Sequence, residues 1–315
     1  AADGAGDSAK SGGLLREGGR RAVDEVYSFI AAEKNNYPVA TMCRIFGVNR
    51  TAFHNWQSRA PSDRALQDLW LTEKIKAIHQ DSRGVYGAPR IHAELRLEYG
   101  IRVGRKRVAR LMTAAGIAGV RPRKRRFTTI RVPGVEPASD LVCRQFRPTE
   151  PDRLWVADIT YLRTGEGWLY LAAVQDAYSR LIVGWSMATH MRSTLVVDAL
   201  GMALARRRPP PGLIHHSDHG SQYVSLAFGR AADQAGIAIS MGSRGDAYDN
   251  AVAETFFATL KKELVSRRGW PNRLELKTAV FEYIEAFYNR RRRHSTLGML
   301  SPTTYEQHQL SSKHS

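Results

Sequence analysis

The chain has 315 residues, of which 43% are hydrophobic and 24% charged, as is ordinary for a globular protein of one or two domains. Its net charge of +17 predicts a polyanionic partner, with nucleic acid as the first candidate and a ribosome-like basic protein as the plain alternative. Two distant cysteines, Cys43 and Cys143, exclude a disulfide framework or a multi-cysteine zinc site, and no stretch has the ~20 consecutive apolar residues of a membrane helix.

The first part of the chain is predicted to be helical. Residues 1–20 are rich in Gly, Ala and Ser, which favours a flexible segment. Apolar spacing then predicts a helix over residues 21–32, and a helix, a tight turn and a second helix over residues 39–59. Gly47 would end one of these helices and Asn49 would cap the next. This pattern suits a helix-turn-helix or an ordinary helical hairpin, and spacing alone does not choose between them.

Further helices are predicted over residues 63–80, 88–99 and 105–115, and the last one is strongly basic. Between Glu98 and Glu136 the chain has 11 Lys or Arg residues and no acid. Contact with DNA phosphates is the favoured interpretation, and a solvated spacer is the alternative. The predicted DNA-contacting side chains in this region are Arg105, Lys106, Arg107, Arg110, Arg121, Arg123, Lys124, Arg125 and Arg126.

After a proline-containing linker at residues 127–150, the pattern changes from helices to strands. Strands are predicted over residues 155–163, 168–176, 181–187, 213–217 and 237–241. Helices are predicted from Ser193, as the capping residue, to residue 207, and over residues 225–235, 250–266 and 274–289. Three antiparallel strands followed by alternating helices and strands predict an α/β fold with a mixed five-stranded sheet and flanking helices.

Three acids occupy unexpectedly apolar surroundings. Asp158 lies in the middle of the first strand, Asp218 follows the strand over residues 213–217, and Glu254 lies in a helix rich in Phe, Leu and Ala. If the two strands are neighbours, the aspartates repel each other unless a cation lies between them. Oxygen ligands alone suit Mg²⁺ or Mn²⁺ rather than zinc. Two such ions about 3.5–4 Å apart could hold the attacking and leaving oxygens of a phosphodiester.

Asn250, Glu254 and Lys261 are four and seven residues apart and therefore share one face of the helix. Lys261 would place an ammonium group beside a DNA phosphate, or it is an ordinary solvated lysine. Nearby polar residues have less specific interpretations. Asp176 is expected to cap its own turn or bind Arg180 rather than a metal, and structural or substrate-contacting roles come before metal binding for His215, His216 and His219.

The chain resembles the transposases of bacterial insertion sequences that have a retroviral-integrase-like core, specifically the second-frame product of the insertion-sequence-three family. The resemblance extends from about residue 27 to about residue 305. The acids Asp218 and Glu254 are separated by 35 residues, the spacing that this group uses. The motifs that carry the resemblance are 155–161 (WVADITY), 176–180 (DAYSR), 216–223 (HSDHGSQY), 249–257 (DNAVAETFF) and 288–294 (YNRRRRH).

The resemblance implies an RNase H-like core in which Asp158, Asp218 and Glu254 are the catalytic, metal-binding residues and Lys261 approaches the DNA end. It implies cleavage at the ends of the element and attack of a 3′-hydroxyl on target DNA, without a covalent protein–DNA intermediate. It further implies a helix-turn-helix region within residues 36–126 that binds the terminal repeats. The two cysteines cannot supply the zinc domain of retroviral integrases.

The expected organisation is a flexible segment at 1–20, a helical DNA-binding region at 21–126, a linker at 127–150, a catalytic core at 151–270 and a basic helix and tail at 271–315. Double-stranded DNA is the expected partner, bound by a homo-oligomer on paired ends, with a further protein from an upstream frame as a possible addition. We expect a cytoplasmic, nucleoid-associated protein without a membrane anchor.

Two other functions compete with this interpretation. One is a helix-turn-helix regulator whose sheet domain has lost its chemistry, and the three intact acids argue against it. The other is an RNase H-type nuclease acting on RNA–DNA hybrids. A basic amino-terminal half argues for a larger duplex footprint, as do the predicted DNA contacts of Arg290, Arg291, Arg292 and Arg293.

Overall fold

The computed structural model describes residues 19–120, 141–142, 146, 148–218, 220–241 and 251–313. The chain divides into two compact units, Ala1–Leu71 and Thr72–Ser315, and the division falls inside helix α4 (Asp63–Asp81). The predicted helical region therefore contributes to both units. No helix within the described ranges is long and apolar enough to cross a membrane.

The first unit contains helices α1 (Gly19–Glu33), α2 (Val39–Ile45) and α3 (Arg50–Ser58). Gly47 has a φ of +65°, which ends α2, and the Asn49 side chain accepts a hydrogen bond from the N–H of Ala52 at 3.0 Å, which caps α3. The predicted helix, turn and helix are therefore present. Their shared core consists of Tyr27, Ile30, Met42, Cys43 and Phe53.

After the end of α4, the second unit continues with a second helix pair, α5 (Ala88–Leu97) and α6 (Arg105–Ala114). Ile91 and Leu95 of α5 are buried, as are Val108 and Leu111 of α6. Because the apolar positions of α6 face inward, its basic positions are left largely on the outside.

The sheet contains β1 (Leu154–Thr164), β2 (Gly167–Asp176), β3 (Ile182–Ala188), β4 (Ile214–Ser217) and β5 (Ala238–Met241). The strand order is β3-β2-β1-β4-β5, with antiparallel pairing among β1, β2 and β3 and parallel pairing of β1 with β4 and of β4 with β5. This confirms the RNase H-like mixed five-stranded sheet. It also confirms that the strands carrying Asp158 and preceding Asp218 are neighbours.

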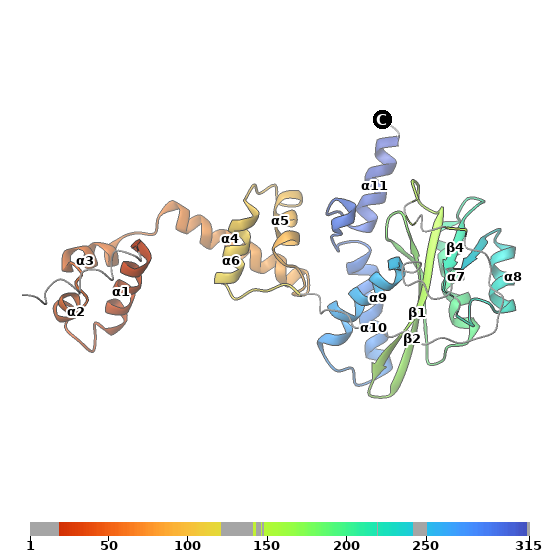
Figure 1. Ribbon diagram of the computed structural model, residues 1–315, viewed down its shortest axis with the longest axis horizontal. Helices are drawn as coiled ribbons and strands as arrows, with labels where there is room; N and C mark the ends of the chain where they lie inside the picture. Colours follow the sequence, from red (N-terminus) through yellow and green to blue (C-terminus); the bar gives the residue numbers. More distant parts are fainter. Residues whose placement is uncertain are drawn as a thin grey trace, which may run out of the picture. The chain divides into compact units, whose positions relative to one another are not determined.

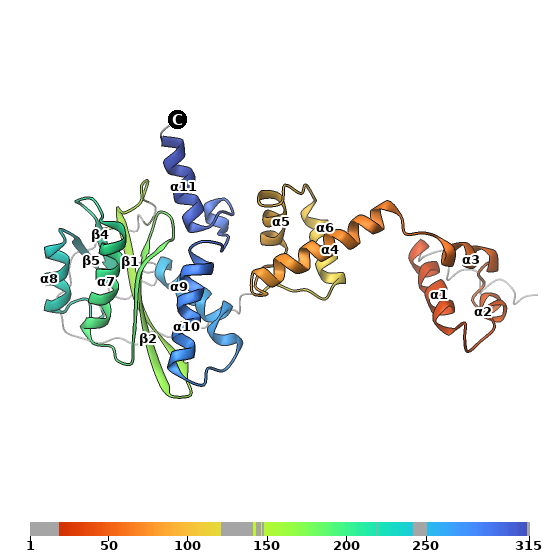
Figure 2. The ribbon, with the colours of Figure 1, turned by 180° about the vertical axis from the view of Figure 1, so that it is seen from behind.

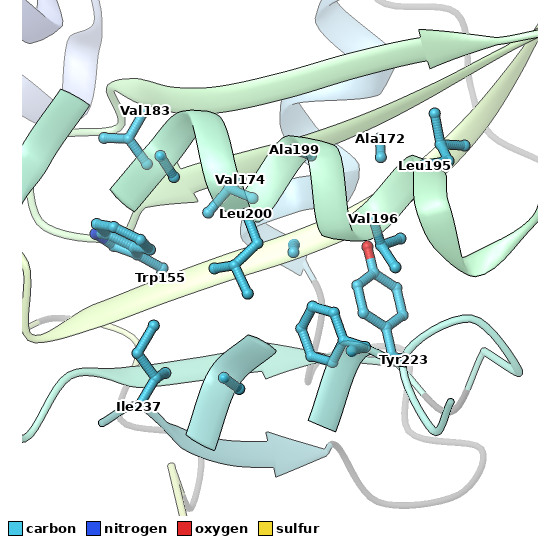
Figure 3. Packing of buried hydrophobic residues seen from close by; sticks show 14 of the residues in the cluster. Trp155, Ala172, Val174, Val183, Leu195, Val196, Ala199, Leu200, Tyr223 and Ile237 are labelled. Atoms are coloured by element: carbon cyan, nitrogen blue, oxygen red, sulfur yellow. The ribbon is translucent and has the colours of Figure 1, made fainter. Parts of the chain in front are cut away.

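Helices cover both faces of this sheet (Figures 1 and 2). One face carries α7 (Ser193–Arg207) and α8 (Leu226–Gln234), and the other carries α9 (Ala251–Glu263) and α10 (Arg273–Glu282). Figure 3 shows the core beneath α7, where Trp155, Val174 and Val183 of the sheet meet Leu200 of the helix. Because successive side chains of a strand point to opposite faces, Trp155 and Ala157 of β1 lie in one core and Val156 lies in the other.

Three local predictions differ from the structure. Helix α7 begins at Ser193 itself, and the residue before it, Arg192, is the N-cap without a side-chain cap bond. The helix predicted over residues 274–289 is interrupted, because α10 passes into a π-helix over Tyr283–Tyr288. The tail contains a further helix, α11 (Pro302–Lys313), held by an ion pair between Arg207 and Glu306 at 2.7 Å.

Candidate active site

Two carboxylates stand where the ladder between β1 and β4 ends. The parallel register ends with Ala157 opposite Ser217, so Asp158 and Asp218 are the next residues on the two neighbouring strands. Strands in a ladder are about 4.8 Å apart, which brings the two acids to the same edge of the sheet. Beyond this point β1 continues to Thr164 with β2 as its ladder partner. Carboxyl ends of parallel strands are the usual place for ligand binding in such sheets.

Asp158 is partly buried, and its Oδ1 atom accepts a hydrogen bond from the N–H of Ile159 at 2.7 Å. Its pKa is raised to about 7, first by burial, then by the negative charge of Asp218, with a smaller contribution from Glu254. The three acids therefore share one electrostatic environment, although they come from β1, from the residue after β4 and from the first turn of α9.

Helix α9 also brings a cation to this edge. Lys261 lies in its last turn, seven residues after Glu254, and the positive charge lowers the pKa of Asp158. The Nζ atom of Lys261 is 4.9 Å from the ring centroid of Tyr161 on β1. Tyr161 and Trp168 are exposed and form an edge-to-face pair with centroids 5.2 Å apart. A positive and aromatic surface thus borders the carboxylates.

The segment after β4 holds Asp218 in place. The N–H of Gly220 donates a hydrogen bond to Asp218 Oδ1 at 3.1 Å, and a Cβ atom added at Gly220 would lie 3.1 Å from the same oxygen. A side chain at this position would therefore crowd the carboxylate. Three residues after Gly220, Tyr223 enters the core (Figure 3), where its ring forms an edge-to-face pair with that of Phe228.

The donor atoms at this edge suit a hard divalent cation. Carboxylate oxygens are the preferred ligands of Mg²⁺ and Mn²⁺. A cation would offset both the burial and the repulsion by Asp218 that raise the pKa of Asp158. The Tyr223 hydroxyl is buried without a hydrogen-bond partner, and its pKa is raised by burial and then by the charges of Asp158 and Asp218. No three His, Cys, Asp or Glu side chains among the described residues already lie close enough to hold one ion.

Asp176 and the two histidines of β4 have structural roles, and Asp176 lies opposite Trp155, at the other end of the β1–β4 ladder from Asp158. Asp176 Oδ1 accepts hydrogen bonds from the N–H and hydroxyl of Ser179 at 2.8 and 3.0 Å, so it caps its own turn. His215 is fully buried, its ring 5.0 Å from that of Phe228, and burial lowers its pKa to about 4. His216 Nδ1 lies 2.9 Å from the Ser240 hydroxyl.

The predicted DNA-binding residues divide into four groups, of which the last is the carboxy-terminal arginine run. Arg105, Lys106 and Arg110 are exposed on α6, and Arg107 is partly buried there. Lys261 is partly buried beside the acids. Six further predicted DNA contacts lie outside the described residues. They are Arg121, Arg123, Lys124, Arg125, Arg126 and Asn250.

The four arginines from residue 290 onward do not behave alike. Arg290 and Arg291 are exposed, whereas Arg292 and Arg293 are 5% and 8% exposed. Arg292 forms a fork-like pair with Glu263, with Nε–Oε2 and Nη2–Oε1 distances of 2.8 and 2.7 Å. The guanidinium groups of Arg292 and Arg293 are therefore occupied inside the protein, which removes both from the predicted DNA-contacting surface.

Sequence reasoning missed Glu263 altogether. It follows two lysines near the end of α9, a pattern that indicates an ordinary solvated helix face. Its partner Arg292 is 29 residues away and belongs to a run that suggests DNA contact. No local signal in the sequence distinguishes the two buried arginines of the run from the two exposed ones.

Sequence comparisons connect this geometry to known families. The model of the family described as "Integrase core domain" matches residues 148–247, and a second model with that description matches residues 235–302. The model described as "HTH-like domain" matches residues 66–125, which include α5 and α6. Asp158 and Asp218 thus lie within the first integrase-core match, and Glu254 lies within the second.

Close relatives come from bacterial insertion elements. The IS600 uncharacterized 31 kDa protein of Shigella sonnei is 45% identical, covering 85% of this chain and 99% of its own length. The transposase of IS629 from the same species is 41% identical, covering 87% of this chain and 93% of its own. Transposase InsF of IS3A from Escherichia coli is 37% identical, covering 90% and 99%.

Solved structures are more distant. The HTLV-2 integrase catalytic core in complex with magnesium matches with a TM-score of 0.41 and 17% identity, covering 51% of this chain and 99% of that one. The BIV integrase catalytic core matches with a TM-score of 0.40 and 17% identity, covering 52% and 99%.

The raised pKa of Asp158 predicts a pH-dependent stability cost in the metal-free protein. The folded state holds this proton more tightly than the unfolded state, so the contribution of Asp158 to stability falls as pH rises from about 4 to about 7 and is constant above that. Asp158→Asn removes the ionisation, and we expect it to be more stable than the wild type at pH 8 by a few kcal/mol, with a much smaller difference at pH 5.

Urea unfolding in EDTA at both pH values measures this difference. The matched control is Asp233→Asn, which changes an exposed acid on α8 and should show no such trend. A stability gain for Asp158→Asn that is equal at pH 5 and pH 8 would contradict the assigned ionisation.

Proposed function

This chain belongs to the family of insertion-sequence transposases that includes those of IS3 and IS629, and we propose that Asp158, Asp218 and Glu254 are the acids with which it cuts the ends of its element and joins them to target DNA. Its integrase core marks it as a polynucleotidyl transferase. The observation that carries the assignment of the acids is the register of β1 and β4, together with the raised pKa of Asp158.

The cofactor that fits these acids is Mg²⁺ or Mn²⁺, held by carboxylate oxygens of Asp158, Asp218 and Glu254. A bound pair of ions would supply Lewis acidity to the attacking and leaving oxygens of the phosphodiester. Lys261 complements the acids from the last turn of α9, since an ammonium group stabilises a DNA phosphate that approaches three carboxylates. The supporting observation is that the charge of Lys261 acts on Asp158.

The proposed reaction exchanges phosphodiester bonds in two stages. In cleavage, a water oxygen bonds to phosphorus at the end of the element, the bond to the 3′-oxygen breaks, and that oxygen leaves as a 3′-hydroxyl. In joining, the 3′-hydroxyl oxygen bonds to a phosphorus of target DNA, loses its proton, and displaces the target's own 3′-oxygen. The three acids and Lys261 bind and orient the reacting strand, and no side chain becomes covalently attached to DNA.

DNA binding is supported by the match to the HTH-like domain over residues 66–125. We propose that α6 and the basic run after it contact the terminal repeats, and that Lys261, Asn250 and the exposed Arg290 and Arg291 extend this contact toward the core. The proposed contacts of the helical region are Arg105, Lys106, Arg107, Arg110, Arg121, Arg123, Lys124, Arg125 and Arg126. We further propose assembly of several copies on paired ends, with an upstream-frame protein as an additional partner.

Conservative substitutions test the three acids. Asp158→Asn, Asp218→Asn and Glu254→Gln keep the shape of each side chain and remove its charge. Each is expected to reduce cleavage and joining of terminal-repeat DNA by about a thousandfold or more, because several kcal/mol of transition-state stabilisation depends on the bound ions. Binding of the same DNA should change little.

The control for these variants is Asp233→Asn, which removes an exposed acid from α8. It should cleave like the wild type. Full activity of any one of the three variants would overturn the assignment of that acid. Faster cleavage of an RNA–DNA hybrid than of terminal-repeat DNA by the wild type would instead favour a nuclease of the RNase H type.

Salt dependence tests the basic surface of α6. Each phosphate contact releases a counterion and contributes about −0.9 to the slope of log affinity against log salt concentration. Replacing Arg105, Lys106 and Arg110 by Ala is therefore expected to weaken binding and to make the slope shallower by about 2 to 3. Arg230→Ala, at an exposed position of α8, should leave the slope unchanged. An unaltered slope in the triple variant would place the DNA elsewhere.

A further inference from the structure

The carboxylate of Glu263 is buried at the end of α9. It is the last residue of that helix, where the helix dipole disfavours a negative charge. Compensation comes from Arg292, which binds both carboxylate oxygens, and from the hydroxyl of Tyr283, which donates a hydrogen bond to Oε2 at 2.8 Å. Tyr283, Glu263 and Arg292 are all nearly inaccessible to solvent. A buried charge of this kind is maintained only while its partners stay in place.

A second arginine reaches Glu263 from the helix pair of α5 and α6. Arg90 of α5 places its Nη1 atom 3.8 Å from Glu263 Oε1. Its Nε atom donates a hydrogen bond to the backbone carbonyl of Arg293 at 2.9 Å. One side chain of the HTH-like domain therefore contacts both the end of α9 and the arginine run of the carboxy-terminal segment.

Two more residues of the HTH-like domain complete this contact. The hydroxyl of Tyr86, a residue only 3% exposed, donates to the carbonyl of Arg291 at 3.0 Å and accepts from the N–H of Arg293 at 2.9 Å. Glu94 of α5 pairs with the guanidinium group of Arg293. The Nη1 atom of Arg293 also donates a hydrogen bond to the carbonyl of Met299 at 3.0 Å, which connects the Arg293–Glu94 pair to the segment after the arginine run.

We propose that these six residues form a clasp that docks the α5–α6 pair on the catalytic core and positions α9, so that engagement of DNA by α6 is coupled to the placement of Glu254 and Lys261. The clasp consists of Tyr86, Arg90, Glu94, Glu263, Arg292 and Arg293. Arg90 is its central positioning residue. The coupling rests on the function proposed above, whereas the docking does not.

The geometry of α9 makes this coupling direct. Glu254 and Glu263 are nine residues apart on one helix, a rise of about 13.5 Å, and a helix of this length moves as a rigid element. A shift at the clasped end is therefore passed to the end that carries Glu254. Because Glu254 acts beside Asp158 from the first turn of the same helix, its placement is sensitive to the position of α9.

The clasp also explains the division within the arginine run. The two exposed members, Arg290 and Arg291, are available to a polyanion, whereas Arg292 and Arg293 are satisfied by Glu263 and Glu94. Paired charges inside the protein add nothing to a phosphate-binding surface. Their substitution should therefore change the core rather than the salt dependence of DNA binding.

The test compares Arg90→Ala with Arg96→Ala, since both remove one arginine from α5 and Arg96 is exposed. The first measurement is hydrogen exchange of the metal-free full chain. In Arg90→Ala, amides of α5, of the last turn of α9 and of residues 289–294 are expected to exchange about tenfold faster or more, because the clasp is open for a larger fraction of the time. Arg96→Ala should exchange like the wild type.

The second measurement separates positioning from DNA binding. Arg90→Ala is expected to bind terminal-repeat DNA with the affinity and salt slope of the wild type and to cleave it about tenfold more slowly or worse, since small misplacements of reacting groups are costly. If Arg90 were a phosphate contact, its substitution would instead make the salt slope shallower by about 0.9. That result would overturn the proposal.

The remaining outcomes are also decisive. Unchanged exchange in Arg90→Ala overturns the clasp, and faster exchange with unchanged cleavage overturns the coupling. If the wild type itself does not cleave, the proposed function fails, while exchange still decides whether the docking exists. Should Arg90→Ala not fold, Tyr86→Phe keeps the ring and removes the hydroxyl that bridges residues 291 and 293, and the same changes are expected in smaller degree.

Discussion

The short length of β4 is the constraint on which the candidate site depends. Because its pairing with β1 stops at Ser217, Asp158 and Asp218 are the first residues beyond the β1–β4 ladder. Burial and the negative charge of Asp218 raise the pKa of Asp158, and the Ile159 N–H and the charge of Lys261 offset this only in part. A longer β4 would cover the edge of β1, and a shorter one would separate the acids.

The buried carboxylate of Glu263 connects the helix that carries Glu254 to other parts of the second unit. Glu263 ties the far end of α9 to Arg292 and, through Arg90, to the helices that match an HTH-like domain. One helix thus carries an acid of the site at its start and a structural ion pair at its end. If the proposed roles hold, the helices that match an HTH-like domain and an acid of the candidate site are connected through this one helix.

Sequence reasoning succeeded where the pattern is local. The strands of the sheet are apolar runs, the turn at Gly47 and Asn49 uses residues with strong positional preferences, and an acid inside an apolar strand stands out as costly. It failed where the outcome depends on distant partners. Arg292 and Arg293 carry the same charge as Arg290 and Arg291, and only the positions of Glu263 and Glu94 decide which of them are buried. The interruption after α10 and the helix α11 likewise have no clear local signal.

The central claim is that Asp158, Asp218 and Glu254 bind divalent metal together. Calorimetric titration of the metal-free full chain with Mn²⁺ tests it most directly, because it requires neither the terminal-repeat sequence nor turnover. The account predicts saturable binding by the wild type and by Asp233→Asn, and weakening by at least about tenfold in each of Asp158→Asn, Asp218→Asn and Glu254→Gln, since each removes a charged ligand. Undiminished Mn²⁺ binding by any of these three variants would contradict it.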